Sequence, residues 1–358
     1  MFMLSSPYKN VLYIGPGHKD HRGGIGAVLD IYSKNIAPFN FISTLAYKNK
    51  FYELFFFFGS VFKLFLRLLT NRKIKIVHIH GAKDGSIFRK SLMCFIARKL
   101  FSKKIVFHSH AGAFDEYYRK RGSLYKYACR FLINNSEAVI VLSDRWNDFF
   151  RKNFKIKRII VIRNPVEHRQ SFVVNQQSRS EIKFLFLGKI VDHKGIFDLV
   201  NLVIEEQNTL RGKCKFLVGG NHEVDMLKKM IKEGGVEDLV EYIGWVKDEQ
   251  KDSFFYMSDY FILPTYHEAM PMTILESLSY GKPVITTPVG GIPEVIENNK
   301  NGMLFQPGDM KQLKKIIFEV INDRSKYDCM RKNAMNTATL FYPESIKLEL
   351  EKLYSEIS

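Results

Sequence analysis

The residues with the clearest chemical capacity lie between positions 267 and 296, where two carboxylates bracket the expected start of a helix. Glu268 follows a short apolar run, and Glu276 comes eight residues later in TILESL, whose apolar character argues against the alternative that both are surface charges. The first amides of a helix lack an intrahelical acceptor, and the helix dipole favours an anion there. The pattern suits a sugar nucleotide, with one carboxylate on sugar hydroxyls, helix amides on phosphate and the second carboxylate on ribose hydroxyls. The residues that we assign to this site are Glu268, Ala269, Met270, Pro271, Met272, Thr273 and Glu276.

Two lysines form a second candidate feature, a clamp for a diphosphate. Lys189 follows Gly188 at the end of an apolar run, and Lys194 stands at the start of the next expected helix. Two ammonium groups that converge on one anion can hold it and stabilise the charge that develops as it departs. Solvated surface lysines are the alternative explanation. Gly219 is expected in a turn at the end of the following apolar run, where a backbone without a Cβ can approach a ligand closely.

The third feature is His110, which follows His108 at the end of another apolar run. A neutral imidazole there can form hydrogen bonds with sugar hydroxyls or phosphate, and a purely structural histidine is the alternative. The two histidines could also ligate a metal, but the sequence shows no third ligand, so we expect no metal site. A glycine-rich stretch that includes Gly24 leads into a helix expected near Ile25, where amides can approach a phosphate. Its spacing is not that of a dinucleotide-binding fingerprint, and a flexible loop is the alternative.

These residues are positioned by alternating apolar runs and amphipathic segments, which predict strands and helices in turn. Continuous apolar runs indicate parallel strands that are covered by helices on both faces. The predicted strands are residues 11–14, 39–45, 74–79, 105–108, 138–142, 159–163, 183–187, 215–218, 240–242, 260–263, 284–286 and 303–305. A polar stretch without periodicity, residues 167–183, is expected to link two such series. We therefore predict an α/β fold with two Rossmann-like doubly wound domains, residues 1–165 and 166–343, that face each other across a deep ligand-binding cleft.

Composition narrows the classes of function and location. A chain of 358 residues exceeds what one core usually supports, which favours two domains. The net charge of +17 attracts anions, although part of the lysine excess can be solvated surface without a partner. The four cysteines are far apart and the first apolar run is too short for a signal peptide. These features favour a reducing, cytoplasmic location.

Residues 51–69 require a separate test for membrane insertion. The segment is largely apolar but carries three charges, so it falls short of a spanning helix. Lys63 and Arg67 are four residues apart, and Arg72 and Lys73 follow, which is typical of a basic amphipathic helix at an anionic membrane surface. A helix that packs its phenylalanines into the core is the alternative, and both explanations can hold for different faces.

Taken together, these motifs resemble the retaining GT-B glycosyltransferases of family 4, of the type that assembles bacterial polysaccharides, over nearly the whole chain. Glu268 and Glu276 match the family's EX7E motif, and residues 290–294 match its GG-x-PE turn. Gly188-Lys189 with Lys194-Gly195 match its phosphate clamp, although many members have arginine where this chain has Lys189, and Gly23-Gly24 match its N-terminal glycine loop. The resemblance implies donor contacts for the two lysines and two glutamates, a sugar contact for His110 and a base pocket that includes Val246. It also implies that the last helix, residues 344–358, packs back on the first domain.

The resemblance further implies an activity, its partners and its location. A hexose or N-acetylhexosamine would pass from a nucleotide-diphosphate sugar to a lipid-linked glycan with retention of configuration, in capsule, exopolysaccharide or lipopolysaccharide synthesis. Glu268, Lys194, Lys189 and His110 would form the catalytic set, without a metal or other cofactor. The protein would be peripheral on the inner face of the plasma membrane, with an anionic membrane surface and no nucleic acid among its partners. A nucleotide-sugar epimerase of the same fold and a non-catalytic lipid- or nucleic-acid-binding protein are the rival interpretations.

Overall fold

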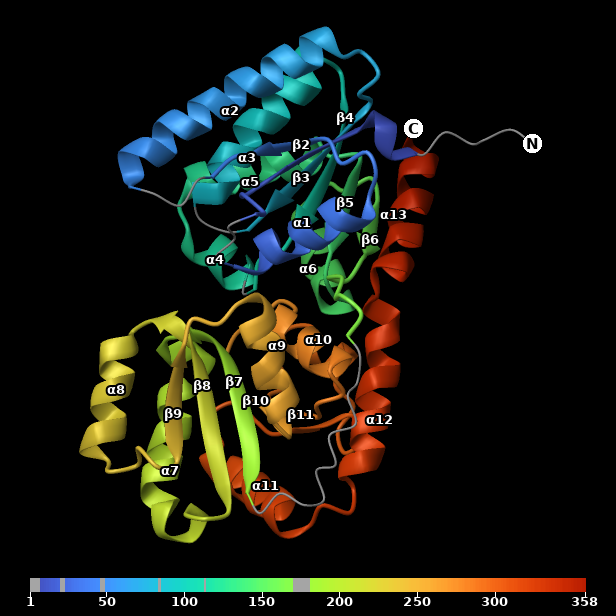
Figure 1. Ribbon diagram of the computed structural model, residues 1–358. Helices are drawn as coiled ribbons and strands as arrows, with labels where there is room; N and C mark the ends of the chain where they lie inside the picture. The colour runs from blue at the N-terminus through green and yellow to red at the C-terminus, as the bar shows by residue number, and fades with distance from the viewer. Residues whose placement is uncertain (1–6, 20–22, 46–48, 83–84, 113, 170–180) are drawn as a thin grey trace. The chain divides into compact units, whose positions relative to one another are not determined.

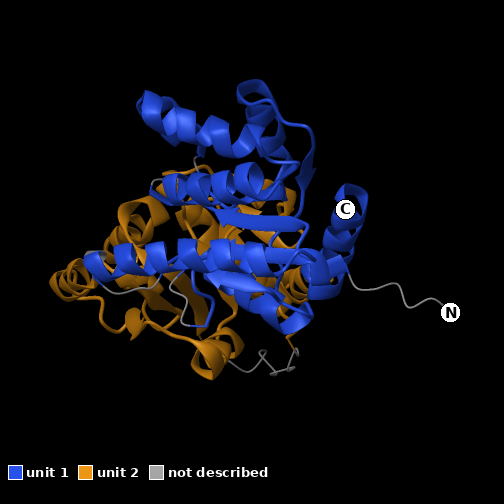
Figure 2. Ribbon diagram, turned by 90° about the horizontal axis from the view of Figure 1, so that it is seen from above, with its two compact units in different colours: residues 1–166, 341–358 blue, residues 167–340 orange. Residues whose placement is uncertain are grey.

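The computed structural model describes residues 7–19, 23–45, 49–82, 85–112, 114–169 and 181–358, which form two compact units (Figure 2). Unit 1 comprises Met1–Val166 and Phe341–Ser358, and unit 2 comprises Glu167–Leu340. The chain therefore leaves unit 1 once and returns to it for its last segment. Most of the expected linker, residues 170–180, lies outside the described residues.

Unit 1 is built on a six-stranded sheet in which all paired strands are parallel, in the order β2-β1-β3-β4-β5-β6. The strands are β1 (Val11–Gly15), β2 (Phe41–Ser43), β3 (Ile76–Gly81), β4 (Lys104–Ser109), β5 (Ala138–Val141) and β6 (Ile159–Val161). All residues of β1, β3 and β5 are buried, as expected for strands that helices cover on both faces.

The C-terminal helix belongs to unit 1 and packs beside its first helix. These are α13 (Pro343–Ile357) and α1 (Gly24–Asn35). The hydroxyl of Tyr8 donates a hydrogen bond to the carbonyl oxygen of Lys347 at 3.0 Å, and the Tyr354 hydroxyl lies 3.1 Å from that of Tyr13. Because Tyr13 is in β1, these contacts fix the last helix of the chain against the sheet of its first domain.

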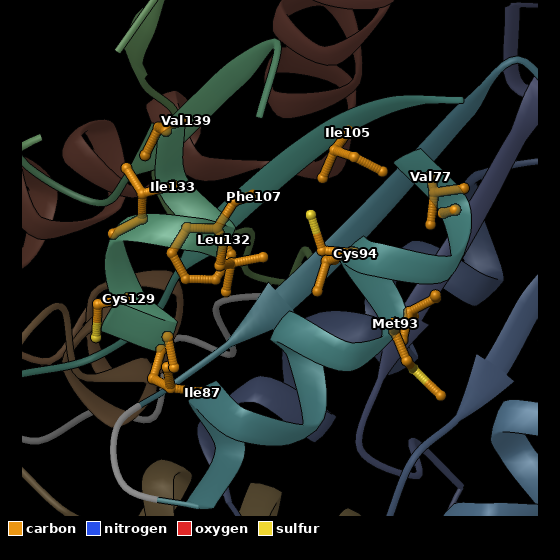
Figure 3. Packing of buried hydrophobic residues seen from close by; sticks show 14 of the residues in the cluster. Val77, Ile87, Met93, Cys94, Ile105, Phe107, Cys129, Leu132, Ile133 and Val139 are labelled. Carbon is orange, nitrogen blue, oxygen red and sulfur yellow. The ribbon is translucent and has the colours of Figure 1, made fainter. Parts of the chain in front are cut away.

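The opposite face of this sheet carries a second helix layer (Figure 1). Its helices are α2 (Lys50–Thr70), α3 (Gly85–Phe95), the single π turn η2 (Ile96–Leu100), α5 (Ser123–Asn134) and α6 (Asp144–Asn153), with the short α4 (Phe114–Lys120) before α5. Figure 3 shows the core between the sheet and this layer, where Cys94 of α3 and Leu132 of α5 pack near Ile105 and Phe107 of β4. The layer is therefore held by apolar packing against the strands.

Unit 2 repeats the design with the order β12-β11-β10-β7-β8-β9, again all parallel. The strands are β7 (Ile182–Ile190), β8 (Cys214–His222), β9 (Val240–Gly244), β10 (Tyr260–Leu263), β11 (Val284–Thr286) and β12 (Gly302–Leu304). The helices are α7 (Ile196–Leu210), α8 (Val224–Glu233), α9 (Asp248–Met257), α10 (Met272–Ser279), α11 (Met310–Asn322) and α12 (Tyr327–Ala338). Each of the twelve apolar runs predicted from the sequence overlaps one strand of the two sheets.

One local prediction is wrong. The glycines at 219 and 220 do not form a turn after a strand, because β7 and β8 continue together with Gly188 opposite Gly220. A Cβ at Gly220 would lie 2.0 Å from the carbonyl oxygen of Gly188, and one at Gly219 would lie 2.6 Å from Cδ2 of Leu187. These glycines therefore permit close packing of two strands.

The segment tested for membrane insertion forms α2, with separate buried and exposed stripes. The buried stripe consists of Phe57, Ser60, Leu64 and Leu68. Arg67 is partly buried, and its guanidinium lies 3.5 Å from the carbonyl oxygen of Phe41, whereas Lys63, Arg72 and Lys73 are exposed. Among the described residues, no helix is long and apolar enough to cross a membrane. One face of α2 thus packs in the core while another remains on the surface.

Candidate active-site residues

The central feature of unit 2 is an ion pair between Lys194 and Glu268. Lys194 ends the short turn η4 (Asp192–Lys194) after β7, and Glu268 lies in the loop after β10. The Lys194 ammonium donates a hydrogen bond to Oε1 of Glu268, and the two side chains are only 16% and 11% exposed. Two residues that are 74 positions apart are therefore brought together in a largely desolvated pair, where electrostatic interactions are stronger than in water.

Backbone contacts hold the two loops that carry this pair. Tyr266 N–H donates to the carbonyl oxygen of His193 at 2.9 Å. Gly195 has a φ of +69°, and a Cβ there would lie 2.0 Å from the carbonyl oxygen of Pro264. Only glycine fits this left-handed, closely packed position. The turn that presents Lys194 is thus fastened directly to the loop that presents Glu268.

The expected GG-x-PE turn supports the same loop from the other side. Gly290 has a φ of +59°, and a Cβ there would lie 2.0 Å from the carbonyl oxygen of Glu268. Gly291 N–H donates to the carbonyl oxygen of Ala269 at 2.8 Å. The two glycines therefore fix the backbone on which the Glu268 carboxylate is mounted.

The second carboxylate of the motif also has a lysine partner. Glu276 lies in α10, and its Oε1 accepts a hydrogen bond from the Lys251 ammonium at 2.7 Å, with both side chains less than one-quarter exposed. Pro271 occupies the N-cap position of this helix without a side-chain cap, and the amides of Met272 and Thr273, the first two helical residues, have no intrahelical acceptor. Lys251, in α9, was not found from the sequence, because nothing in the run DEQKDSFF distinguishes it.

Two other candidates of unit 2, Lys189 and Val246, lie outside the two lysine–glutamate pairs. Lys189 is exposed at the end of β7, opposite Asn221 in β8, and makes no ion pair within the described part of the chain. Val246 is buried just after β9, next to the exposed Trp245. An open hollow of about 400 Å³ is lined by residues that lie close to Lys194 or Glu268 in sequence, namely Asp192, His193, Phe197, Asp198, Tyr266 and His267. This hollow gives unit 2 room for a ligand, although neither Lys194 nor Glu268 is among the residues that line it.

Unit 1 contributes a row of four histidines that the sequence suggested only in part. His78 and His80 lie in β3, and His108 lies in β4 opposite His80. Because alternate residues of a strand share a face, all of these rings project to the same side of the sheet. The ring centroids of His78 and His80 are 4.4 Å apart, and those of His108 and His110 are 4.2 Å apart. His110 is thus the end of a stacked series that begins inside the sheet.

Burial keeps these imidazoles neutral. It lowers the pKa of His110 to about 3, against the opposing effect of a hydrogen bond with Asn164. It likewise lowers the pKa of His78 to about 3, with the electrostatic effect of the neighbouring His110 as a smaller cause. Nδ1 of His80 lies 2.9 Å from Nε2 of His110, so one of the two must be the donor. The structure therefore presents His110 as a neutral ring held by stacking and a hydrogen bond.

The sequence singled out His108 and His110 as a possible metal-binding pair, whereas the geometry groups His108 with two histidines of β3. Nitrogen atoms of His78, His80 and His108 all lie within 4.8 Å of one another, so these residues could hold a transition-metal ion. Two HxH patterns at the ends of successive predicted strands would have been the signal. Burial is the main cause of the lowered pKa of His80, and the neighbouring His78, His108, His110 and Lys90 lower it further.

The glycine-rich loop of unit 1 leads into α1 as expected, one residue earlier than predicted. Gly23 is the N-cap and Gly24 is the first helical residue, and both are exposed. Residues 20–22 of the loop lie outside the described residues. An anion could therefore reach the first amides of α1.

Comparison with known proteins accounts for most of the chain. Residues 168–337 match the profile of glycosyl transferases group 1, and residues 33–170 match that of glycosyltransferase family 4. An uncharacterised 41.2 kDa protein in the cps region of Klebsiella pneumoniae is 25% identical over 277 residues, which is 72% of this chain and 73% of that protein. The Escherichia coli UDP-Gal:alpha-D-GlcNAc-diphosphoundecaprenol alpha-1,3-galactosyltransferase is 25% identical over 291 residues, 75% of this chain and 72% of that enzyme.

A solved structure supports the architecture. HepE of Anabaena, determined in complex with UDP, matches with a TM-score of 0.75 and 17% identity over 97% of this chain and 100% of HepE, which shows a common fold. Two parallel-sheet units, a carboxylate pair on one loop and helix, and two adjoining family profiles agree with one another. The chain belongs to the family 4 glycosyltransferases and has the GT-B fold.

Proposed function

We propose that this glycosyltransferase moves a hexose or an N-acetylhexosamine from a nucleoside-diphosphate sugar to a lipid-linked glycan, with retention of anomeric configuration. The reaction would serve bacterial capsule, exopolysaccharide or lipopolysaccharide synthesis at the inner face of the plasma membrane. The observation that carries the proposal is the pairing of each EX7E glutamate with a lysine, at the loop and helix start where an anion is favoured.

In this mechanism the donor replaces one interaction of the central pair. Its diphosphate draws the Lys194 ammonium, and the Glu268 carboxylate that is released accepts hydrogen bonds from sugar hydroxyls. Lys189, exposed on the preceding strand, and the first amides of α10 provide further positive charge toward the phosphates. Glu276, which forms an ion pair with Lys251, accepts hydrogen bonds from the ribose hydroxyls.

The same groups stabilise the products of bond cleavage. As the bond between the sugar and the diphosphate breaks, negative charge accumulates on the departing oxygen, and preorganised donors lower the barrier by meeting that charge. Lysines and helix amides would supply what a metal ion supplies in other transferases. The departing phosphate would accept the acceptor's proton on the same face, which gives retention.

His110 is proposed to contact the transferred sugar from unit 1. Its neutral state suits it to form hydrogen bonds with a hydroxyl rather than to attract the phosphates. Because His80 and Asn164 engage it, the ring is held in one orientation, which favours positioning of the sugar.

The relatives guide the choice of acceptor and donor base for the first tests. The Escherichia coli relative is named for a diphosphoundecaprenol acceptor, and HepE was crystallised with UDP. The exposed basic residues Lys63, Arg72 and Lys73, with the partly buried Arg67, suit an anionic membrane surface where such an acceptor resides. We therefore propose a polyprenyl-diphosphate-linked glycan as acceptor and UDP-sugars as the first donors to examine.

A thermal-shift screen with EDTA present tests the donor assignment. A ligand at 100 times its dissociation constant stabilises the native state by about 2.7 kcal/mol. UDP-, GDP-, ADP- and CMP-sugars and the free nucleotides would be compared, and the stabilising donor would then be incubated with a diphosphoundecaprenol-linked glycan. Nuclear magnetic resonance of the product would give the anomeric configuration. No stabilisation by any nucleotide, or an inverted product, would contradict the proposal.

A further inference from the structure

The exposed stripe of α2 is unusually apolar for a surface helix. It consists of Phe51, Leu54, Phe55, Phe58, Phe62, Phe65, Leu66 and Leu69, which are between 39% and 79% exposed. Residues of such a stripe recur every three to four positions, so they lie on one side of the helix along its whole length. A helix of 21 residues is about 32 Å long. Phe65 packs edge-on against Phe101 of the same unit, with ring centroids 5.2 Å apart, but the core otherwise uses the buried stripe, so packing within unit 1 does not explain most of these side chains.

The apolar surface continues onto the neighbouring helices of the same layer. Phe88, Leu92 and Phe95 of α3 are exposed at successive turns, and Leu124 and Tyr127 of α5 are 71% and 68% exposed. Figure 1 shows α2, α3 and α5 together on one side of unit 1. Of the twenty large hydrophobic side chains that are exposed among the described residues, fifteen belong to α2, α3, η2 and α5. We call this surface the aromatic face.

Charge on these four segments is almost entirely of one sign. Their sequences contain a single acidic residue, Glu53. Burial lowers the pKa of Arg89, and the negative charge of the Glu53 carboxylate partly opposes that shift. The basic residues of the four segments outside the core are Lys50, Lys63, Arg67, Arg89, Arg98, Lys99, Lys126 and Arg130, whereas Lys90 is buried and donates a hydrogen bond to the Thr44 hydroxyl. Apolar side chains mixed with basic ones, and almost no acidic ones, are typical of a helix lying in the interface of an anionic bilayer.

This charge pattern decides between the possible occupants of the aromatic face. A second copy of the chain would bring two basic surfaces together, which is unfavourable. A bilayer with anionic headgroups offers negative charge at its surface and apolar chains beneath it. The headgroups can pair with the basic side chains, and the acyl chains can take up the apolar ones. Exposed apolar patches of this extent on soluble proteins generally mark interaction sites.

We propose that unit 1 docks by inserting the aromatic face, chiefly the exposed stripe of α2, into the boundary between headgroups and acyl chains of an anionic bilayer. The inference deepens the proposed membrane location and rests on it. It differs from adhesion by surface charge alone, because the phenylalanines enter the bilayer and the basic residues lie around them at the headgroups.

Vesicle flotation tests the surface without requiring catalysis. Wild type is expected to float with phosphatidylglycerol-containing vesicles and much less with pure phosphatidylcholine. Phe58→Ser/Phe62→Ser should lower the affinity for the anionic vesicles at least about tenfold, because two large apolar side chains no longer leave water. The matched control is Leu340→Ser/Leu348→Ser, which alters two residues 67% and 66% exposed outside the aromatic face and should float like wild type.

The depth to which the aromatic face enters the bilayer is measured with the variant Phe62→Trp and vesicles of brominated lipids. We expect bromine in the upper part of the acyl chains to quench the fluorescence of the introduced tryptophan. Binding without quenching would overturn insertion in favour of surface adhesion, and unchanged flotation of Phe58→Ser/Phe62→Ser would overturn the aromatic face as the docking surface. A dimer that this variant abolishes, without vesicle binding by wild type, would assign the face to a second copy instead.

The outcome is separable from that of the proposed activity. Lys194→Ala should float like wild type although it is expected to transfer sugar poorly. Phe58→Ser/Phe62→Ser should retain the thermal shift caused by the donor. Loss of that shift in Phe58→Ser/Phe62→Ser would indicate misfolding. The test would then use Phe58→Tyr/Phe62→Tyr, which preserves the aromatic rings, and the inference stands only if this variant floats like wild type.

Discussion

Replacing Lys194 by alanine is the most direct test of the central ion pair. Lys194 is 16% exposed and Glu268 is 11% exposed, so the ammonium acts in a site with little water. Loss of one preorganised group that stabilises developing charge typically lowers kcat by ~10²–10³-fold. A 100-fold loss corresponds to about 2.7 kcal/mol of activation free energy. We therefore expect Lys194→Ala to lower kcat at least ~100-fold at saturating donor.

The same substitution has an effect on stability that can be separated from catalysis. It leaves the Glu268 carboxylate without its ion-pair partner, and a buried polar group without a partner costs on the order of 1–3 kcal/mol of unfolding free energy. The further change Glu268→Gln removes the charge that had lost its partner. The double variant should therefore recover part of the lost stability, as measured by chemical denaturation, while its turnover stays low.

The assay is steady-state transfer with the acceptor proposed above and the donor that the thermal-shift screen selects. The matched control is Lys229→Ala in α8, where Lys229 and Glu233 form an ion pair 3.8 Å long with side chains 71% and 67% exposed. Exposed pairs contribute about 0–1 kcal/mol, so this variant should keep both stability and kcat. A folded Lys194→Ala enzyme whose kcat remains close to that of the control would refute the assignment of the lysine to the departing diphosphate.

Three other predictions follow from the same geometry. Glu276→Ala should raise the donor KM, and Lys251→Ala should do so less, because the lysine acts by holding the carboxylate; equal KM values in wild type and Glu276→Ala would contradict this. Gly290→Ala should lower the unfolding free energy by at least ~1–2 kcal/mol, the cost of a left-handed residue with a Cβ, which denaturation would measure. His78 and His110 have pKa values near 3 in the folded protein, below the unfolded value, so the unfolded state binds more protons between about pH 6.5 and 3. Unfolding free energy should therefore fall as pH is lowered through that range, and His78→Gln should flatten the curve.

The sheets were predictable because buried parallel strands are continuous apolar runs, and each such run became a strand. Their ends were less predictable. The glycines at 188, 219 and 220 are typical of turns, yet they lie within β7 and β8, since a strand can also require glycine where another backbone approaches within van der Waals distance. Sequence alone does not distinguish a turn from a close approach. Only the pairing of Gly188 with Gly220 identifies the second cause.

The site was predictable where motif residues lie near one another in sequence. Glu268, Glu276 and the start of α10 fall within nine residues, so their relation follows from helix geometry. Lys251 was not predictable, because its contact with Glu276 depends on how α9 packs beside α10. The histidine row shows the intermediate case, since two HxH patterns predict a cluster only once β3 and β4 are known to be neighbours.

The ion pair between Lys194 and Glu268 also implies that recognition of phosphate and recognition of sugar are coupled. A free nucleoside diphosphate can draw the ammonium away from the carboxylate, but it leaves Glu268 in an 11% exposed position with no hydroxyl to replace its partner. A sugar nucleotide supplies both the phosphate for the lysine and hydroxyls for the carboxylate, so the cost of separating the pair is offset only by the complete donor. The preference for a sugar nucleotide over its free nucleotide should therefore originate largely at Glu268, and that difference in affinity, rather than affinity for the nucleotide itself, is the quantity that reports on this carboxylate.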